Sequence, residues 1–402
     1  MTTVSERQVS AEQARVEELL DELLAEADPT GDPHEFLGAQ FDKGLAWVYF
    51  PEGHGGLGLS PKLQRVIDER LRDAGAPHPV RYNVIGHGMG APTIVTHGTE
   101  EQKDRYLRPL FTGEEVWCQL FSEPGAGSDV AALATRAIRD GDEWIVNGQK
   151  VWTTVAHISK WGMLVARTDP DVPKHKGMTY FIMDMEDPGV EVRPLRQITG
   201  EAEFNEVYMT DVRIPDAHRI DDVGAGWRVA ITTLMNERVA IGGNVTPRNW
   251  GPIGRAVELW QDYDFKDEVT RDHLMKLWTE AETARLTNLR AQQLRSKGTP
   301  GPAGSVAKLV YAELNKDIWD FCVDLMGPEG QLYDTYEMIV PTEVEVGGGQ
   351  RDTRRAFLRA RANSIEGGTS EIMKNILGER VLGLPGEPRV DKDIAWKDVP
   401  RS

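Results

Sequence analysis

Apolar residues near the start of the chain recur at the spacing of one helical face. These residues are Val16, Leu19, Leu20, Leu23, Leu24 and Ala27. Asp28-Pro29 ends this predicted helix, and a Gly/Pro-rich loop follows over 50–61. Further helices are predicted over Pro61–Ala74 and Glu100–Phe111, with irregular chain between them. The first part of the chain is therefore predicted to be helical.

From Val116 the apolar pattern changes to short runs that are typical of strands. Asn147-Gly148 separates two such runs and predicts a β-hairpin, because this dipeptide favours a tight type I′ turn. The predicted strands are Cys118–Phe121, Glu143–Val146, Gln149–Thr153, Thr179–Met185, Val190–Pro194, Glu206–Met209 and Val212–Ile214. Short strands at this spacing predict a small sheet or barrel in the middle of the chain.

After Gly226 the pattern returns to long helices. They are predicted over 226–241, 267–297, 303–326 and, with breaks, 352–380. The order of helices, then strands, then helices predicts an α+β fold with two or three domains, and a length of 402 residues agrees with that number.

Composition excludes several classes of protein. The net charge of −18 argues against a nucleic-acid or anionic-membrane partner, and a polyanionic ligand would need a local basic patch. The two cysteines, Cys118 and Cys322, give no disulfide framework. The chain shows no secretory signal and no apolar run of membrane length, so a cytoplasmic location is expected.

One stretch, 118–154, contains the strongest candidate chemistry. Two glycines in the turn Pro124–Asp129 allow backbone amides to approach a ligand closely. Trp152 followed by Thr153-Thr154 combines a flat aromatic ring with small hydroxyl donors, which suits a planar heteroaromatic ring such as a flavin. The alternatives are an ordinary turn and a tryptophan that packs within the sheet. The sequence shows no metal-ligand spacing of histidines, no Ser-His-Asp set and no dinucleotide-binding strand–GxGxxG–helix unit.

As a string, this stretch resembles the signature of the acyl-CoA dehydrogenase family. Ser364–Pro385 resembles the C-terminal segment that closes over the flavin in that family, and the resemblance extends from about Val84 to Pro385. It implies FAD as cofactor and three domains: an N-terminal helical domain over 1–115, a middle β-barrel-like domain over 116–222 and a C-terminal four-helix bundle over 223–388. The remaining residues, 389–402, have the composition of a polar tail.

The resemblance also implies a reaction, the oxidation of an acyl-CoA thioester to the trans-2-enoyl-CoA. A base removes the α-proton while the β-hydrogen leaves as hydride to flavin N5. The base must be a carboxylate in a dry cleft, where desolvation raises its pKa, and hydrogen-bond donors must polarise the thioester carbonyl. The expected partners are the acyl-CoA substrate and an electron-transfer flavoprotein as acceptor.

Two positions compete for the base. Many family members place a glutamate directly before the Gly-Thr of the C-terminal motif, but Gly367 stands there in this chain and Glu366 lies one residue earlier. Another branch, which acts on long or branched chains, carries its base in the first helix of the C-terminal domain, and Glu237 matches that position. Glu237 is therefore predicted to be the base, with Arg238 holding Glu237 or the coenzyme A moiety. The alternative is that neither residue has a catalytic role: Glu237 is exposed on its helix, and Arg238 pairs with a structural carboxylate.

The helical geometry agrees with this assignment. At about 100° per residue, Glu237 falls on the border of an apolar stripe. The stripe consists of Trp227, Ala230, Ile231, Leu234 and Ile241.

The resemblance implies further site residues. The amide of Gly367 would polarise the thioester carbonyl, and Gly368 and Ser128 would contact the substrate, Ser128 also lying near the flavin phosphates. Thr369 or Ser370 is also a candidate N-cap of the helix that follows, and both roles can hold together. The implied flavin contacts are Phe121, Ser122, Ser128, Trp152, Thr154, Thr369 and Glu371.

The chain departs from the family in two stretches that contact the adenine half of FAD in homo-oligomeric relatives. Asp262–His273 lacks an Arg-x-x-Phe-Gly motif, and Leu325–Gly330 lacks a Gln followed by Gly-Gly-x-Gly. Either a related subunit supplies these contacts in an α2β2 assembly, or other residues replace them in a homo-oligomer. An acyl-CoA oxidase or flavin monooxygenase on the same fold, and a non-catalytic subunit, are the alternative functions. Glu237 argues against the last of these. The substrate is expected to be branched, long or bulky, steroid side chains included.

Overall fold

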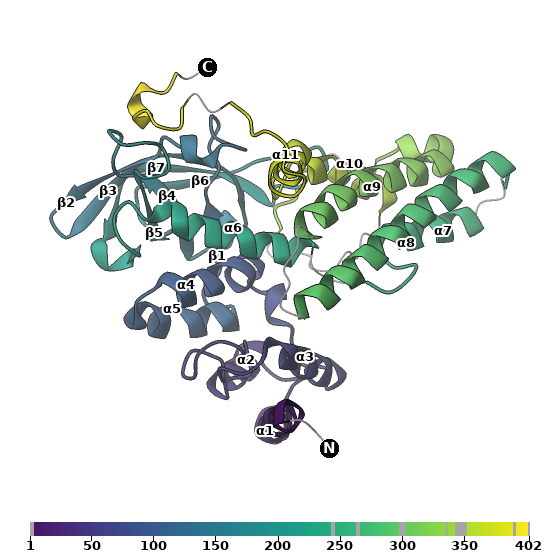
Figure 1. Cartoon of the computed structure of the whole chain (residues 1–402), viewed down its shortest axis with the longest axis horizontal. Helices are drawn as coiled ribbons and strands as arrows, with labels where there is room; N and C mark the ends of the chain where they lie inside the picture. Colours follow the sequence, from purple (N-terminus) through teal and green to yellow (C-terminus); the bar gives the residue numbers. More distant parts are fainter. Residues whose placement is uncertain are drawn as a thin grey trace.

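The computed structural model describes residues 4–242, 246–262, 266–296, 303–333, 335, 337–341, 352–388 and 391–400. Helices at both ends of the chain flank a central sheet (Figure 1). The predicted α+β fold, with N-terminal helices, a middle sheet and a C-terminal helical bundle, is confirmed.

The N-terminal part packs five α-helices around two apolar cores. Val16, Leu20 and Leu23 lie fully buried on the predicted face of the first helix. The start of the fifth helix is fixed by a capping box between Thr99 and Gln102. The helices are α1 (Val4–Glu26), α2 (Pro33–Asp42), α3 (Gln64–Asp73), α4 (Ala91–His97) and α5 (Glu100–Thr112). Helices α2 and α4 were not predicted, because they are short and lie in stretches rich in Gly, Pro and His.

The middle part is an eight-stranded sheet with the order β6-β7-β3-β2-β4-β5-β8, and β1 pairs with β4 in parallel. Every residue of β4 is buried, so its sequence does not alternate between apolar and polar positions and gave no strand signal. The strands are β1 (Trp117–Leu120), β2 (Arg136–Asp140), β3 (Glu143–Thr154), β4 (Trp161–Arg167), β5 (Met178–Asp184), β6 (Val190–Pro194), β7 (Phe204–Pro215) and β8 (Arg219–Ile220).

The hairpin predicted at Asn147-Gly148 is wrong. β3 runs unbroken through both residues, and the chain turns one strand earlier, at Gly141 with φ 63°. A Cβ on Gly148 would lie 2.3 Å from the hydroxyl oxygen of Thr135, so this glycine permits a close approach. Asn147 exchanges hydrogen bonds with Asp211 at a register shift between β3 and β7. Strand β7 is also continuous, although two separate strands were predicted there. Asn147-Gly148 therefore lies at a β-bulge instead of a turn.

The C-terminal helices form the predicted bundle. Apolar side chains of α7, α8, α9 and α10 share one core, while α6 lies between the sheet and α4 (Figure 1). The helices are α6 (Gly226–Gly242), α7 (Pro252–Asp262), α8 (Glu268–Ser296), α9 (Ala303–Met326), α10 (Thr353–Ala360) and α11 (Ser370–Arg380). Within the described chain, no helix has the length and apolar character needed to cross a membrane.

The end of the chain returns from α11 to the sheet (Figure 1). The sequence suggests only a polar tail, but the described part, 391–400, is docked. The guanidinium of Arg167 lies 4.8 Å from the ring centroid of Trp396, and the indole Nε1 donates to the carbonyl of Ala132 at 3.2 Å. Lys397 pairs with Asp171 at 2.6 Å. Trp396 and an ion pair thus anchor this largely polar segment.

Candidate functional site

The segment after β1 and the end of β3 lie side by side. The amide of Val151 donates to the carbonyl of Ser122 at 2.9 Å. Lys150 is fully buried, and its ammonium donates to the carbonyl of Phe121 at 2.9 Å and to the carboxylate of Glu123 at 2.8 Å. The structure therefore brings together Phe121, Ser122 and the residues that follow Lys150, as the flavin-site prediction requires.

Glu123 fixes the glycine-rich turn that follows it. Its carboxylate accepts the amides of Ala134 at 2.6 Å and Thr135 at 3.0 Å, and its backbone closes a bridge with Ala126. Burial alone would raise the pKa of Glu123, but Lys150 and the amide of Ala134 outweigh burial and lower the pKa below its usual value. Glu123 is consequently an ionised structural anchor of the turn.

Trp152 has a backbone conformation that turns its ring outward. Its φ is 61°, at a register shift between Lys150 and Thr153 in the pairing of β3 with β7. The indole is 56% exposed and stands edge-on to Phe204, with the ring centroids 5.7 Å apart. A left-handed tryptophan in a strand is unusual, so plain sheet packing does not explain it. The exposed flat face at the end of β3, beside Thr154, fits a planar ring.

The glycine-rich turn leaves room for a ligand. A Cβ built on Gly125 or Gly127 meets nothing within 4 Å, so no protein neighbour requires a glycine at either position. Ser128 is exposed beside them. The next residue, Asp129, pairs with Lys174 at 2.6 Å, and Lys174 also pairs with Asp391 of the docked C-terminal segment at 2.5 Å. These open positions fit the approach of phosphate groups to the backbone.

The C-terminal motif forms a second glycine-rich turn before α11. Gly367 and Gly368 have φ values of 63° and 94°, which favour glycine. Thr369 is the N-cap of α11, because its hydroxyl accepts the amide of Ile372 at 3.1 Å. Glu371 is exposed in the first turn of that helix. The N-terminal end of α11 thus offers amides and a positive dipole beside the glycines.

Glu366 does not stand in for the missing glutamate at 367. Its carboxylate pairs with the guanidinium of Arg359 through contacts of 3.2 and 2.9 Å and accepts the side-chain amide of Asn363 at 2.7 Å. Since both carboxylate oxygens are engaged in these contacts, Glu366 stabilises the turn.

Lys308 of α9 joins this turn to α6. The ammonium is almost fully buried and donates to the carbonyls of Asn363 at 2.9 Å and Gly368 at 2.5 Å. Burial lowers the pKa of Lys308, and nearby carboxylates oppose that shift in part, in the order Glu366, Glu313, Glu237 and Glu371. Carboxylates from α6, α9, the turn and the start of α11 therefore all act electrostatically on one buried cation.

Lys308 was not predicted from the sequence as a residue of the site. A signal does exist: Lys308 and Asn315 lie two turns apart on the inner face of α9, and both bind Asn363, whose side chain accepts the amide of Asn315. Polar residues at that spacing on an apolar helical face indicate a buried polar contact.

A chain of side chains connects the two halves of the site. The ring of Phe204, which contacts Trp152, lies 5.7 Å from the guanidinium carbon of Arg359, and Arg359 pairs with Glu366. Arg359 also approaches Glu203 at 3.4 Å. Burial raises the pKa of Glu203, against the effect of Arg359. The two sequence motifs thus contribute to one continuous wall.

The buried face of α6 differs in part from the predicted stripe. Ala230 is buried as predicted, but Ile231 is 40% exposed, and Val229 and Thr233 are fully buried in its place. The reason is that α6 packs on α4 and β5 through a face that includes a threonine. Glu237 is half-buried. The side chain of Arg238 lies outside the described residues.

Three family descriptions match successive parts of the chain. The acyl-CoA dehydrogenase N-terminal domain matches residues 6–114, the middle domain 118–212 and the C-terminal domain 224–382. Acyl-CoA dehydrogenase FadE34 of Mycobacterium tuberculosis is 40% identical over 86% of this chain, which corresponds to only 45% of FadE34. Acyl-CoA dehydrogenase IpdE1 of the same organism is 37% identical over 86% of both chains.

Solved structures agree with these matches. The ChsE4–ChsE5 complex from Mycobacterium tuberculosis is similar with a TM-score of 0.69 and 27% identity, over 96% of this chain and 99% of the other. Tcur3481–Tcur3483 steroid ACAD has the same fold, with a TM-score of 0.70 at 24% identity over 96% of this chain and 99% of the other. From its three matched domains and its 37% identity with a relative of similar length, the chain belongs to the acyl-CoA dehydrogenase family of flavoprotein oxidoreductases.

Proposed function

We propose that this protein catalyses the FAD-dependent α,β-dehydrogenation of an acyl-CoA thioester, with Glu237 as the base that removes the α-proton. The observation that carries this proposal is the shared environment of Lys308. Its ammonium bonds the carbonyl of Gly368 and lies within electrostatic range of Glu237, while Glu366 pairs with Arg359. Glu237 is half-buried on α6.

When bound, FAD supplies the two-electron acceptor for the hydride that leaves Cβ. In this proposal Trp152 and Thr154 hold the flat ring, with Phe121 and Ser122 beside them on the wall formed by β1 and β3. Ser128, on the open glycine-rich turn, serves the phosphates.

On the opposite side, the amide of Gly367 donates to the thioester carbonyl, with Gly368 against the substrate. The N-terminal end of α11 adds a positive dipole near the developing charge, and Thr369 and Glu371 at that end contact the flavin. Lys308 keeps the turn in place from behind. Arg238 is assigned to hold Glu237 or the coenzyme A moiety, as its position in the sequence suggests.

The test compares Glu237 with Glu366, which both act electrostatically on Lys308. In the FAD-loaded protein, anaerobic mixing with acyl-CoA bleaches the flavin absorbance. Glu237→Gln is expected to slow this bleaching by about 10²- to 10⁴-fold, the usual contribution of a general base. Glu366→Gln is the matched control and is expected to retain the rate within about tenfold, a difference of about 1.4 kcal/mol. Rapid bleaching by Glu237→Gln would show that the base lies elsewhere.

The substrate is proposed to be a branched, long or bulky acyl-CoA. Support comes from the place of the base on α6 and from 26% identity with a structure described as a steroid ACAD variant. Bleaching rates over a panel of straight, branched and steroid-side-chain acyl-CoAs test it. Preference for short straight chains would contradict this substrate class.

The electron acceptor is proposed to be an electron-transfer flavoprotein in the cytoplasm. After anaerobic reduction by substrate, admission of air should reoxidise the flavin slowly, whereas an electron-transfer flavoprotein should reoxidise it rapidly. Fast reoxidation by O2 alone would instead identify an acyl-CoA oxidase or a flavin monooxygenase.

The assembly is proposed to be α2β2 with a related subunit. Exposed apolar side chains gather beside the wall: Ile198 and Ile339 are 72% and 50% exposed, and their segments are joined by hydrogen bonds between Gly200, Ala202 and Ile339. The similar ChsE4–ChsE5 structure is a complex of two chains. Flavin content per chain of the protein purified alone is the test. Full and tight occupancy would contradict the mixed assembly and favour a homo-oligomer.

A further inference from the structure

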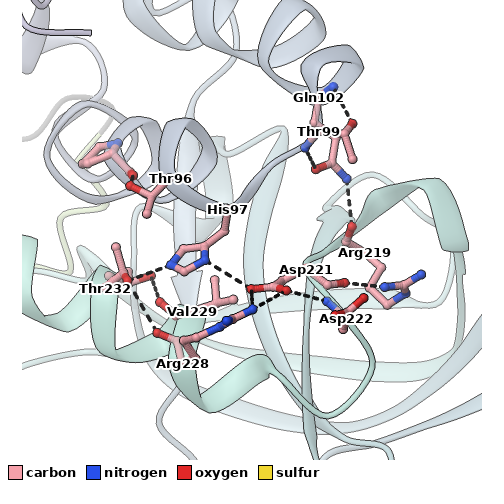
Figure 2. Close-up of polar contacts among 12 residues, drawn as sticks. Thr96, His97, Thr99, Gln102, Arg219, Asp221, Asp222, Arg228, Val229 and Thr232 are labelled. Atoms are coloured by element: carbon pink, nitrogen blue, oxygen red, sulfur yellow. Dashed lines mark hydrogen bonds and ion pairs between the residues drawn. The ribbon is translucent and has the colours of Figure 1, made fainter. Parts of the chain in front are cut away.

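Helix α6 is tied to α4 shortly before Glu237. Figure 2 shows His97, the last residue of α4, between two partners. Its Nε2 lies 2.8 Å from the hydroxyl oxygen of Thr232, and its Nδ1 lies 3.2 Å from the carboxylate of Asp221. His97 and Asp221 have side chains only 11% and 12% exposed. The contact therefore joins the N-terminal helices, the end of the sheet and α6.

Asp221 is a fixed acceptor for the imidazole. Its backbone φ is 66°, and its carboxylate accepts Arg228 at 2.6 and 2.5 Å and the amide of Asp222 at 2.8 Å (Figure 2). Burial raises the pKa of Asp221, but the amide of Asp222 and Arg228 outweigh burial and lower it. An ionised carboxylate only accepts, so Nδ1 of His97 carries a proton. In the neutral ring, Nε2 then accepts from the hydroxyl of Thr232.

A second contact lies beside the first. The hydroxyls of Thr93 on α4 and Thr233 on α6 are 2.9 Å apart, and the hydroxyl of Tyr180 on β5 is 3.2 Å from Thr233. All three residues are fully buried. Tyr180 also contacts the ring of Phe121, with centroids 5.9 Å apart. This contact therefore links α6 to the wall assigned to the flavin.

The spacing of these contacts fixes both the rotation and the height of α6. Thr93 and His97 are one turn apart on α4, and they bind the adjacent residues Thr232 and Thr233. Thr233 and Glu237 are also one turn apart, on the same side of α6. A shift of α6 by one residue means about 1.5 Å of rise and about 100° of rotation, which would break both contacts.

We propose that His97 and Thr93 are positioning residues for Glu237. They act through Thr232 and Thr233, and they hold α6 so that the carboxylate faces the turn at 366–369. This inference rests on the proposed role of Glu237. A base must lie within hydrogen-bond reach of the proton it removes, and an error of about 1 Å can cost about 10²-fold in rate.

The order Thr232–His97–Asp221 is also that of a hydrolase triad, but the surroundings do not suit acyl transfer. Thr232 lies inside α6, where the neighbouring amides are used by the helix, and its hydroxyl is 3.5 Å from the carbonyl of Arg228. The carboxylate of Asp221 is shared with a guanidinium. The cluster is therefore a structural contact between α4 and α6, and it resembles a catalytic triad only in the order of its hydrogen-bonded residues.

The experiment removes one hydroxyl without changing the shape of its side chain. In the FAD-loaded protein, Thr232→Val is expected to slow anaerobic flavin bleaching by about 10- to 10²-fold while the substrate Kd stays the same. Thr232→Ser, which keeps the hydroxyl, is expected to restore the rate. Thr96→Val is the matched control, since Thr96 lies on α4 next to His97 and bonds the carbonyl of Pro92 in its own helix at 2.6 Å (Figure 2).

Hydrogen exchange of amides 232–237 supplies a readout that does not depend on activity. Thr232→Val is expected to speed this exchange, and Thr96→Val is expected to leave it unchanged. Unchanged exchange together with a wild-type bleaching rate in Thr232→Val would overturn the positioning role. If Glu237→Gln bleached at the wild-type rate, the proposed function would fail by itself, and faster exchange in Thr232→Val would still support the joint between α4 and α6.

Discussion

Two glycine-rich turns border the proposed site, and they are held in different ways. The turn at 124–128 depends on its own sheet, because Lys150 and Glu123 are buried against each other and against nearby backbone. The turn at 366–369 depends on a distant helix, since Lys308 of α9 donates to the carbonyl of Gly368. The first turn is a preformed part of the sheet, whereas the second follows from the packing of the C-terminal helices.

The glutamate before each pair of glycines has the same role in both turns. Glu123 pairs with Lys150, and Glu366 pairs with Arg359. The two glutamates differ in burial, because the side chain of Glu123 is 8% exposed and that of Glu366 is 32% exposed. A carboxylate next to a ligand-facing turn can thus be an anchor of the turn.

The largest effect is expected at the buried pair of the first turn. Lys150→Met removes one partner and leaves the carboxylate of Glu123 buried without its cation, which costs about 3–5 kcal/mol of unfolding free energy. Denaturant unfolding monitored by tryptophan fluorescence measures this. Lys62→Met, at an exposed lysine, is expected to change stability by less than about 0.5 kcal/mol. Equal effects of the two variants would mean that the first turn does not depend on the pair.

The same pair predicts a dependence on pH. Because the folded pKa of Glu123 lies below its usual value of 4.5, its ionised form contributes stability above about pH 4.5, and this contribution is lost as pH falls through the folded pKa. The difference in unfolding free energy between the wild type and Glu123→Gln should therefore shrink on acidification. A difference that stays constant from pH 7 to below pH 4 would contradict the ionised state of Glu123.

A smaller effect is expected at the second turn. Lys308→Met leaves the carbonyls of Gly368 and Asn363 without a buried donor, at a cost of about 1–3 kcal/mol. The amides of 366–369 should exchange hydrogen faster than in the wild type. Lys316→Met, two turns further along α9, removes a partly exposed pair with Glu313 and should cost less than about 1 kcal/mol. If both variants left the exchange unchanged, the second turn would not depend on Lys308 for its stability.

The contrast between the turns also explains what the sequence could predict. Local patterns located α9 to the residue, because periodicity acts over a few neighbours, whereas both motifs were identified by their resemblance to a family. The Asn147-Gly148 hairpin was wrong because pairing of β3 with β7 outweighs a local turn preference. Lys308 and the Thr232–His97–Asp221 joint were missed, since their partners lie far apart along the chain.

The smallest effect on unfolding free energy is expected at the C-terminal segment. This prediction tests whether that segment helps to stabilise the first turn. Trp396→Phe keeps an aromatic ring for Arg167 but loses the hydrogen bond to the carbonyl of Ala132. The guanidinium of Arg167 itself donates to the carbonyls of the two neighbouring residues, Ala131 and Leu133. The expected cost is about 0.5–1.5 kcal/mol, the usual net value of one hydrogen bond. Trp396→Ala should cost more because the cation–π contact is also lost. Hydrogen exchange over 128–133 separates the two possibilities. If exchange rises in both variants, the end of the chain helps to hold the turn, whereas unchanged exchange means that the charges of the sheet hold it alone.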